Sequence, residues 1–247
     1  MIKQDLAILF SGGSASLSLY VLAAMRKYHD VPSARTIHLL HMLNGVSRFH
    51  GVPNQRFKTA EEILKSQTPQ KDPLPESTFI EIDISNLFQR LWIDKFEDLM
   101  PKYNHKNLIC VACNLAMHTR AVIYCMEHSV PNLLAGHSRK QSHLAQQSEA
   151  FIKRLTAFSQ QFGINTRFPL YDEVDDEVVT RLHLHDHGIP STGGGKSRCL
   201  FAETLSTVTE AEIERYLDDV LPELVSYVES RLEGRIRDTA MSIAPKE

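Results

Sequence analysis

The feature that most constrains the fold is a glycine-containing loop, Ser11–Ser16, which joins an apolar run to an amphipathic stretch. The run Leu6–Phe10 predicts a first strand, and apolar residues at helical spacing over 14–28 predict a helix. Glycine allows the backbone to turn sharply, and free N–H groups at a helix start favour an anion. The segment therefore predicts a phosphate site or, alternatively, a tight turn in which a serine caps the helix.

The same alternation of short apolar runs and amphipathic stretches continues along the chain. Further strands are predicted over 36–43, 78–84, 132–135 and 166–168, and helices over 57–66, 87–99, 118–128, 142–162 and 175–187. Strands separated by helices imply crossover connections, so we expect an α/β fold with a doubly wound parallel sheet. A charged amphipathic segment over 209–234 predicts a helical extension. We expect a nucleotide-binding domain over 1–205 and this extension over 206–247.

Length and composition narrow the class of protein. The chain has 247 residues, 43% of them hydrophobic, which is enough for a substantial core. Its net charge of −3 gives no sign of a globally basic nucleic-acid binder. No apolar run of about 18 residues stands out, so we expect no membrane span. The N-terminus resembles a strand rather than a secretion signal, which predicts a cytoplasmic protein. The sequence leaves a homodimer open.

Four cysteines are present, and two of them form a C-x-x-C pair, Cys110 and Cys113, between a predicted strand and a predicted helix. Cys199 lies far downstream, and Cys125 falls inside a helical pattern typical of a core residue. A C-x-x-C spacing lets two thiolates reach one metal centre, but the same spacing occurs in zinc half-sites, redox pairs and by chance. Without a secretion signal, thiols, a metal or a cluster are favoured over disulfides.

Several motifs, in this order, resemble those of the PP-loop ATP pyrophosphatase superfamily. Phe10–Ser16 is similar to its phosphate loop S-G-G-x-D-S, His41–Gly45 to the end of its second strand, and Leu133–His137 to its G-H signature. Phe168–Asp172, with the helix and Ile189-Pro190 that follow, is similar to its P-L-x-D, helix, G-I-P segment. The resemblance spans most of residues 5–200. It implies that ATP or AMP is bound by these residues: Ser11, Gly12, Gly13, Ser14, Ser16, His41, Asn44, Gly136 and His137.

The chain departs from the family pattern at two places. Ala15 stands where the family has an aspartate, and Lys140 and Gln141 stand where acidic residues usually follow the G-H pair. A carboxylate near phosphates commonly helps to hold Mg²⁺. The resemblance therefore implies the fold and phosphate binding for this chain, but it does not imply Mg²⁺ binding or adenylation of a substrate.

Within that superfamily, the cysteines resemble those of the tRNA 2-thiolation enzymes. The resemblance implies that Cys110, Cys113 and Cys199 hold a [4Fe-4S] cluster with one open iron and act in sulfur transfer to a nucleotide or tRNA base. The alternatives are zinc held by the same cysteines with His118 or His137, and a nucleotide- or zinc-binding module without adenylation activity. A third is a ligase that activates the carboxylate of a small-molecule substrate.

Basic residues near these motifs have two interpretations each. Lys196 lies in the glycine-rich segment 193–197, which is either a flexible loop or a lid that brings Lys196 to a phosphate. Arg48, Arg56 and Lys58 follow the second predicted strand. They form either a solvated face or a contact with an RNA or nucleotide backbone.

Overall fold

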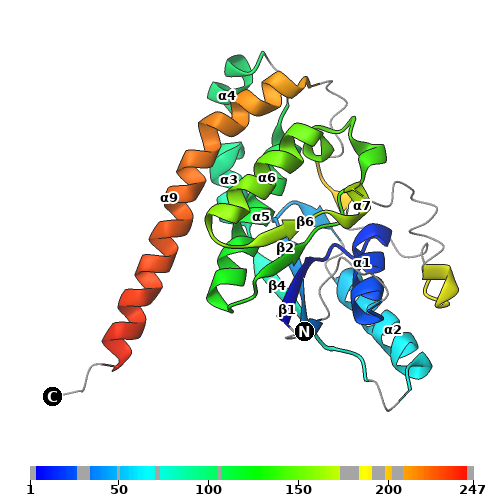
Figure 1. Ribbon diagram of the computed structural model, residues 1–247. Coiled ribbons are helices and arrows are strands. Elements are labelled where there is room, and N and C mark those ends of the chain that lie inside the picture. Colours follow the sequence, from blue (N-terminus) through cyan, green and yellow to red (C-terminus); the bar gives the residue numbers. More distant parts are fainter. Residues whose placement is uncertain are drawn as a thin grey trace.

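The centre of the molecule is a five-stranded parallel sheet. We analysed a computed structural model, which describes residues 4–26, 34–48, 51–69, 73–104, 107–172, 184–190, 198–201 and 208–243. The strands lie in the order β4-β2-β1-β5-β6. Their bounds are β1 (Gln4–Leu9), β2 (Ala34–Leu43), β4 (Glu76–Asp83), β5 (Asn132–Leu134) and β6 (Asn165–Arg167). All four neighbouring pairs are parallel, which confirms the predicted α/β sheet (Figure 1).

The strand order reverses between β1 and β5, because the chain builds outward from β1 in one direction and then in the other. Leu6 pairs with Ile37 on one side and with Asn132 on the other. In doubly wound sheets, ligands bind outside the carboxyl ends of the strands at such a reversal. The fold thus directs attention to the loops that follow Leu9 and Leu134.

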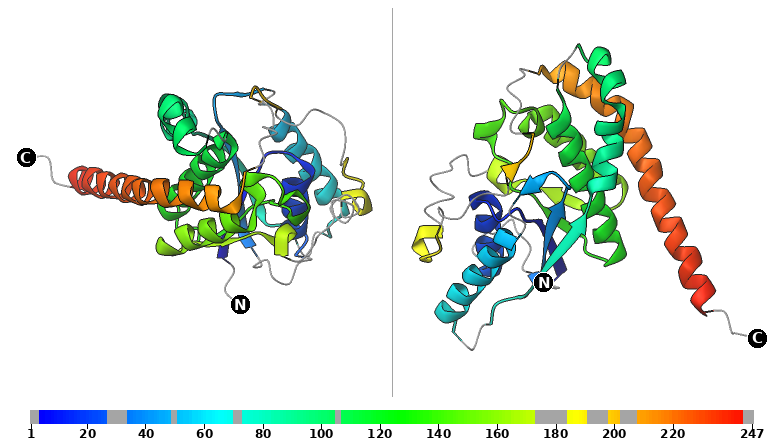
Figure 2. Two further views of the ribbon diagram at one scale, coloured as in Figure 1. Left: turned by 90° about the horizontal axis from the view of Figure 1, so that it is seen from above. Right: turned by 180° about the vertical axis from the view of Figure 1, so that it is seen from behind.

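Helices cover both faces of the sheet (Figures 1 and 2). On one face lie α1 (Ser14–Ala24) and α2 (Gly51–Gln67), packed with Leu6, Ile8 and Leu39. On the other face lie α3 (Ser85–Leu91), α4 (Phe96–Lys102), α5 (Ile109–Glu127), α6 (Glu149–Gln161) and α9 (Glu210–Ile243). Side chains alternate between the two layers along each strand, as Leu39 and Leu40 of β2 illustrate.

The remaining elements are short. Single turns of 3-10 helix occur at η1 (Ile93–Lys95), η2 (Arg139–Gln141) and η3 (Ala145–Gln147), and α7 covers Pro169–Asp172. The strand β3 (Ser47–Arg48) pairs antiparallel with β7 (Arg198–Cys199) outside the main sheet. This small ribbon connects residues that are about 150 positions apart and carries Cys199 to the edge where the main strands end.

The first half of α9 is part of the core. Ile213, Tyr216, Leu217, Leu224 and Val228 are buried against the layer that contains α5 and α6. The hydroxyl of Tyr216 donates to the Leu91 carbonyl at 3.2 Å, and the Tyr103 hydroxyl donates to Asp219 at 2.6 Å. In Figure 1 the remainder of the helix runs away from the body of the molecule. The sequence predicted this helix but ended it near residue 234, and it continues without interruption through Pro222.

Several predicted boundaries were wrong in instructive ways. The helix expected over 118–128 begins at Ile109, so both residues of the C-x-x-C pair lie inside α5 rather than before a helix. The helix expected over 87–99 is broken at Trp92 into α3, η1 and α4. The helix expected from 142 begins at Glu149, because the Ser148 hydroxyl caps it by accepting from the Phe151 N–H at 3.3 Å. Most of the helix expected over 175–187 lies outside the described residues.

Helix α5 is long and apolar enough to cross a membrane by length and composition alone, which the sequence did not predict. Most of its length is buried within the core, and it packs between the sheet and α9. The core helix of a globular domain passes the same test, so α5 gives only weak support for a membrane span.

Candidate functional site

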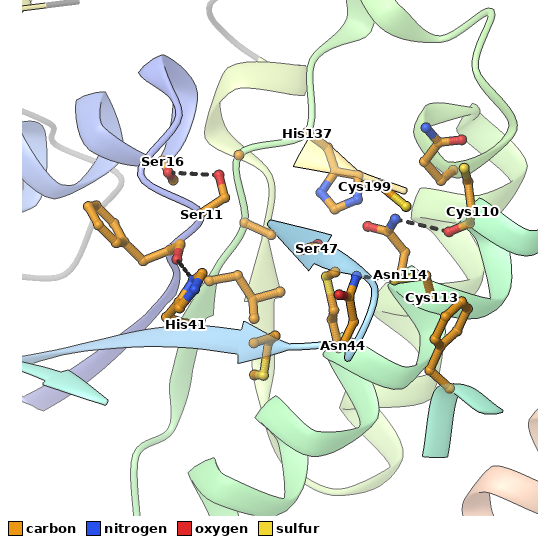
Figure 3. Close-up of a pocket in the computed structure, with 18 of the residues that line it drawn as sticks. Ser11, Ser16, His41, Asn44, Ser47, Cys110, Cys113, Asn114, His137 and Cys199 are labelled. Atoms are coloured by element: carbon orange, nitrogen blue, oxygen red, sulfur yellow. Dashed lines mark hydrogen bonds between the residues drawn. The ribbon is translucent and has the colours of Figure 1, made fainter. Parts of the chain in front are cut away.

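A cavity of about 340 Å³ opens at the carboxyl ends of β1, β2 and β5 (Figure 3). It lies at the reversal of strand order, as expected for a sheet of this type. Residues from the phosphate-type loop, the end of the second strand, the G-H motif and the three-cysteine set line it. They are Ser11, Ser16, His41, Asn44, Cys110, Cys113, Gly136, His137 and Cys199. The fold therefore brings the phosphate-type loop and the three cysteines into one pocket.

The loop after β1 is held by its own serines. The Ser11 and Ser16 hydroxyls lie 3.3 Å apart, Gly13 N–H donates to the Ser11 hydroxyl at 3.3 Å, and the Ser16 hydroxyl donates to the Gly13 carbonyl at 3.2 Å. Helix α1 starts at Ser14 with no side-chain cap. Ala15 and Ser16, in the first turn of α1, line the cavity, so the positive end of this helix borders the pocket. Gly12, Gly13 and Ser14 shape this loop, but they are not among the residues that line the cavity.

Two glycines allow close packing around the loop. Gly12 has a φ of +71°, and a Cβ at this position would lie 2.8 Å from the Cα of Pro53 in α2. A Cβ on Gly136 would lie 3.2 Å from the backbone nitrogen of Ser16. Side chains at either position would push α2 or the end of β5 away from the loop. The G-H motif is thus explained in part by contact of Gly136 with the first turn of α1.

His41 is fixed at the end of β2. Its ring is buried, lies nearly parallel to the Phe79 ring at a centroid distance of 5.8 Å, and places Nδ1 3.1 Å from the Phe10 carbonyl. Because a carbonyl can only accept, Nδ1 carries the proton in this contact. His41 therefore ties the start of the phosphate-type loop to β2 and forms part of the cavity wall.

Cys113 is partly buried in the cavity wall. Its pKa is raised to about 12, mainly by burial; a hydrogen bond from Asn44 acts in the opposite direction, and electrostatic interactions with Cys110 and Cys199 contribute smaller increases. Asn44 Nδ2 donates to Cys113 Sγ at 3.4 Å, while its Oδ1 accepts from the Val46 N–H at 3.1 Å. The side chain of Asn44 is thereby aimed at the sulfur. Without a cation beside it, Cys113 stays a thiol at neutral pH.

Cys110 and Cys199 approach the pocket from different elements. Cys110 is partly buried in the first turn of α5, where Asn114 donates to its carbonyl at 3.0 Å. Cys199 is exposed on β7, opposite Ser47 of β3. Cys125 is buried in the core and does not line the cavity, in line with its predicted packing role. All four cysteines are free thiols.

The donor set suits a soft metal centre, although the structure does not assemble one. Three thiols line the same cavity, and thiolates are the ligands that iron–sulfur clusters and zinc prefer. A hydrogen bond to a cysteine sulfur, as from Asn44, is typical of cluster sites. Within the described residues, however, no three His, Cys, Asp or Glu side chains lie close enough to hold one ion.

The described lining of the cavity carries no Asp, Glu, Lys or Arg. Ala15 lines it where the resemblance would place an aspartate. Arg139 follows the G-H motif but is not among the lining residues. Its Nε donates to the Tyr171 carbonyl at 3.0 Å, and its guanidinium carbon lies 4.5 Å from the centroid of the Tyr171 ring. Lys140 and Gln141 lie in η2 and are not among the lining residues. Lys196 falls outside the described residues, so its predicted role stays untested.

Several pocket residues had no signal in the sequence. Ser47, Asn114, Gln146 and Gln147 add neutral polar groups, and Met117 and Phe201 add apolar surface. Asn114 could have been suspected because it directly follows Cys113. The two glutamines come from η3, and Gln147 Oε1 accepts from the Ser138 N–H at 2.8 Å. No residue pattern marks them as site residues, since glutamine is common in surface turns.

His137, which lines the cavity, forms a buried pair with His118, which does not line it. Their ring centroids are 5.4 Å apart, and Phe168 packs against both rings. Burial lowers the pKa of His137 to about 4 and places the pKa of His118 well below its ordinary value. Both rings are therefore neutral at physiological pH. Neither histidine belongs to a group of metal-ligating side chains among the described residues, so the predicted Cys₃His zinc set is not assembled either.

Comparisons with known proteins agree with the fold. No family model matches the chain, and no curated protein matches it. Among solved structures, the chain is similar to the U34-tRNA thiolase NcsA from Methanococcus maripaludis with its [4Fe-4S] cluster, with a TM-score of 0.53 and 16% identity. The similarity covers 100% of this chain and 75% of that one. At this identity the similarity establishes a related fold rather than a family.

Proposed function

We propose that this chain is a sulfur-transfer enzyme related to the PP-loop tRNA thiolases. It would bind ATP or AMP at Ser11–Ser16 and a [4Fe-4S] cluster at Cys110, Cys113 and Cys199, and it would act on a nucleotide or a tRNA base. The observation that carries the proposal is the single cavity that contains both the phosphate-type loop and all three thiols. The structural similarity to a tRNA thiolase that contains a [4Fe-4S] cluster supports it.

The roles of the chain's own residues follow from their positions. The uncapped first turn of α1 offers backbone N–H groups and a positive dipole end to a phosphate. His41 and Asn44, at the end of β2, line the cavity beyond that turn, where the rest of a nucleotide would lie. Cys110, Cys113 and Cys199 would ligate three irons of a cluster. When bound, such a cluster supplies an open iron that can hold a sulfur atom for transfer.

The substrate end of the pocket is neutral in its described part. Asn114, Gln146 and Gln147 offer amide donors and acceptors, and no described lining cation is available to pair with a carboxylate. A neutral heterocyclic base therefore suits this lining better than a small-molecule carboxylate does. This supports a nucleotide or tRNA base as the substrate. We also propose a cytoplasmic location, as the N-terminal sequence predicts.

One observation favours a second candidate, a nucleotide-binding module without adenylation activity. The described lining offers no carboxylate for Mg²⁺, because Ala15 replaces the expected aspartate. Such a module would bind AMP or ATP and a metal, including zinc, without splitting ATP. The division into a domain over 1–205 and an extension over 206–247 stays a prediction.

Metal and sulfide analysis of anaerobically purified protein tests the proposal. We expect a brown protein with absorbance near 400 nm and about four irons and four sulfides per chain, the content of one cubane cluster. Replacing Cys110, Cys113 or Cys199 by alanine should abolish the cluster. Cys125→Ala is the matched control, because Cys125 also lies on α5 but outside the cavity. A colourless protein with zinc would count against the cluster.

A second assay distinguishes a sulfur-transfer enzyme from a nucleotide-binding module without adenylation activity. The loaded protein is incubated with ATP, a sulfide source and unmodified tRNA, and the digested nucleosides are analysed by mass spectrometry. Formation of a thiolated nucleoside together with AMP and pyrophosphate would support the enzyme. Tight binding of AMP with neither product would support the second candidate.

A further inference from the structure

Phe201 is an exposed aromatic side chain in the lining of the cavity. Its exposed fraction is 46%, so a large part of its ring is open to a ligand. It comes two residues after Cys199, and between them the Leu200 N–H donates to the Val46 carbonyl at 2.8 Å. This bond ties the backbone beside Phe201 to the residue before β3. The ring is therefore held near the cysteine side of the cavity.

Two amide side chains line the same cavity and have hydrogen-bonding groups to spare. Asn114 Nδ2 donates to the Cys110 carbonyl at 3.0 Å, while its Oδ1 has no partner within the described part of the chain. The side-chain amide of Gln146, in η3, makes no hydrogen bond to any described residue. In Figure 3, Asn114 lies with the cysteines, on the side of the cavity away from Ser11 and Ser16. The two amides offer acceptors and a donor to a ligand there.

A nucleobase has an aromatic face and a polar edge, and this side of the cavity offers a partner for each. Proteins commonly hold unpaired bases by stacking them on aromatic side chains and by hydrogen bonds to their edges. A base inside a duplex has its faces covered and its Watson–Crick edge paired, so only an unpaired base can use the ring and the amides together. The cavity of about 340 Å³ has room for one base, and its described lining carries no Asp, Glu, Lys or Arg that would select a charged ligand.

We propose that Phe201 is the stacking platform for one unpaired base of an RNA strand, with Asn114 and Gln146 hydrogen-bonded to the edge of that base. The face of the base lies on the phenyl ring, and its edge points toward the amides beside the thiols. The phosphate-type loop stays available to the nucleotide cofactor. The inference rests on the proposed function for its substrate class and adds the residues that bind the substrate.

RNA binding by the metal-free, full-length protein tests the stacking platform. The probes are a short, fluorescently labelled single-stranded RNA, the same strand annealed to its complement, and AMP. Fluorescence anisotropy measures the RNA affinities, and titration calorimetry measures that of AMP. We expect the single strand to bind about tenfold more tightly than the duplex, because only the single strand has a base free to stack.

Substitutions distinguish stacking from general apolar contact. Phe201→Ala should weaken binding of the single strand about tenfold, and Phe201→Leu should do the same because it keeps apolar bulk without an aromatic face. Phe201→Trp keeps that face and should bind as tightly as the parent. Gln146→Ala should weaken binding about fivefold, the effect of one net hydrogen bond.

The chain offers two matched controls. Phe96→Ala removes a ring that has the same exposed fraction of 46% but lies on α4, outside the cavity lining. Leu200→Ala removes the exposed neighbour of Phe201, which is not a lining residue either. Both variants should bind the single strand as the parent does. Melting temperatures of all variants should match the parent, because the substituted side chains lie at least partly exposed at the surface or cavity wall.

The outcomes are distinguishable. If the single strand binds no better than the duplex, or if Phe201→Ala binds it as tightly as Phe96→Ala does, the stacking platform is wrong, and the thiolation assay still decides sulfur transfer. If Phe201→Ala weakens AMP binding instead of RNA binding, the ring stacks on the adenine of the cofactor and the inference is also wrong. RNA binding that depends on Phe201, in a protein that forms neither a cluster nor a thiolated product, would uphold the base site and refute sulfur transfer.

Discussion

Asn44 Nδ2 donates to Cys113 Sγ at 3.4 Å and so joins the end of β2 to the first turns of α5. This contact connects the strand edge, where the nucleotide would lie, to one of the three pocket thiols. It also opposes the effect of burial, because burial raises the pKa of Cys113 and this hydrogen bond lowers it, leaving a net value of about 12. A donor aimed at sulfur stabilises the thiolate, which is the form that binds metal.

The first prediction concerns Asn44→Ala. Removing the donor should make a reconstituted metal centre about tenfold shorter-lived under chelator challenge, because a hydrogen bond to a charged group contributes about 1.5–3 kcal/mol. Decay of absorbance near 400 nm measures this lifetime. Asn114→Ala is the matched control, since Asn114 also lines the cavity but donates to the Cys110 backbone carbonyl. Equal lifetimes in the two variants would show that the bond to sulfur has no special role.

The second prediction concerns acid. The pKa of His137 falls to about 4 in the folded protein, and that of His118 falls well below its usual value of 6.5. Because both histidines bind protons more weakly in the folded protein than in the unfolded chain, acid favours unfolding. Their contribution to stability is present above about pH 6.5 and is lost as the pH falls toward 4. The shift of His137 alone should lower the free energy of unfolding by about 2 kcal/mol between pH 7 and pH 5.

Urea unfolding at the two pH values measures that loss. His118→Leu should lessen the decrease, because an apolar side chain of similar size has no proton to gain. His143→Gln is the control, since His143 is exposed in the turn before η3. A decrease as steep in His118→Leu as in the parent would assign the acid sensitivity to other groups.

Much of the fold could be predicted from periodicity alone. The apolar runs of β1, β2 and β4 are separated by helical patterns, and parallel order then follows from the crossover rule. The position of the motifs at one edge of the sheet could also be predicted, because the carboxyl ends of parallel strands meet at that edge. The start of α5 was missed because Ile109–Met117 contains two cysteines, which are poor helix formers, although Asn107 Oδ1 accepts from the Ile109 N–H at 3.0 Å and so marks the start.

The finer arrangement of the site depends on contacts that carry no local signature. The pairing of Ser47 with Cys199 rests on a two-residue ribbon, too short for an alternating pattern. The role of Arg56 was ambiguous in the sequence because a basic residue after a strand is most often solvated, and only the fold brings Pro190 to its guanidinium. Gln146 and Gln147 line the cavity because they lie in the short turn η3. The geometry of that turn is determined by tertiary packing, which leaves no local pattern in the sequence.

The third prediction concerns Ala15→Asp. Ala15 lines the cavity at the start of α1, so a carboxylate there would supply the missing oxygen ligand for Mg²⁺. We expect ATP binding to become dependent on Mg²⁺ in this variant and to remain independent of it in the parent. Ala15→Asn has nearly the same size without the charge and should resemble the parent. Titration calorimetry with and without Mg²⁺ decides, and an equal gain in both variants would contradict the prediction.

The last prediction concerns the glycines of the loop. Gly12 and Gly163 share a φ of +71°, but a Cβ on Gly12 would lie 2.8 Å from Pro53 Cα, whereas one on Gly163 would meet nothing within 4 Å. Gly163→Ala should therefore cost about 1 kcal/mol for backbone strain alone. Gly12→Ala should cost that amount plus at least about 1–3 kcal/mol, because α2 must shift away from the loop. Denaturant unfolding measures both, and AMP affinity should fall only in Gly12→Ala. Similar losses of stability in the two variants would mean that α2 yields easily and does not hold the loop in place.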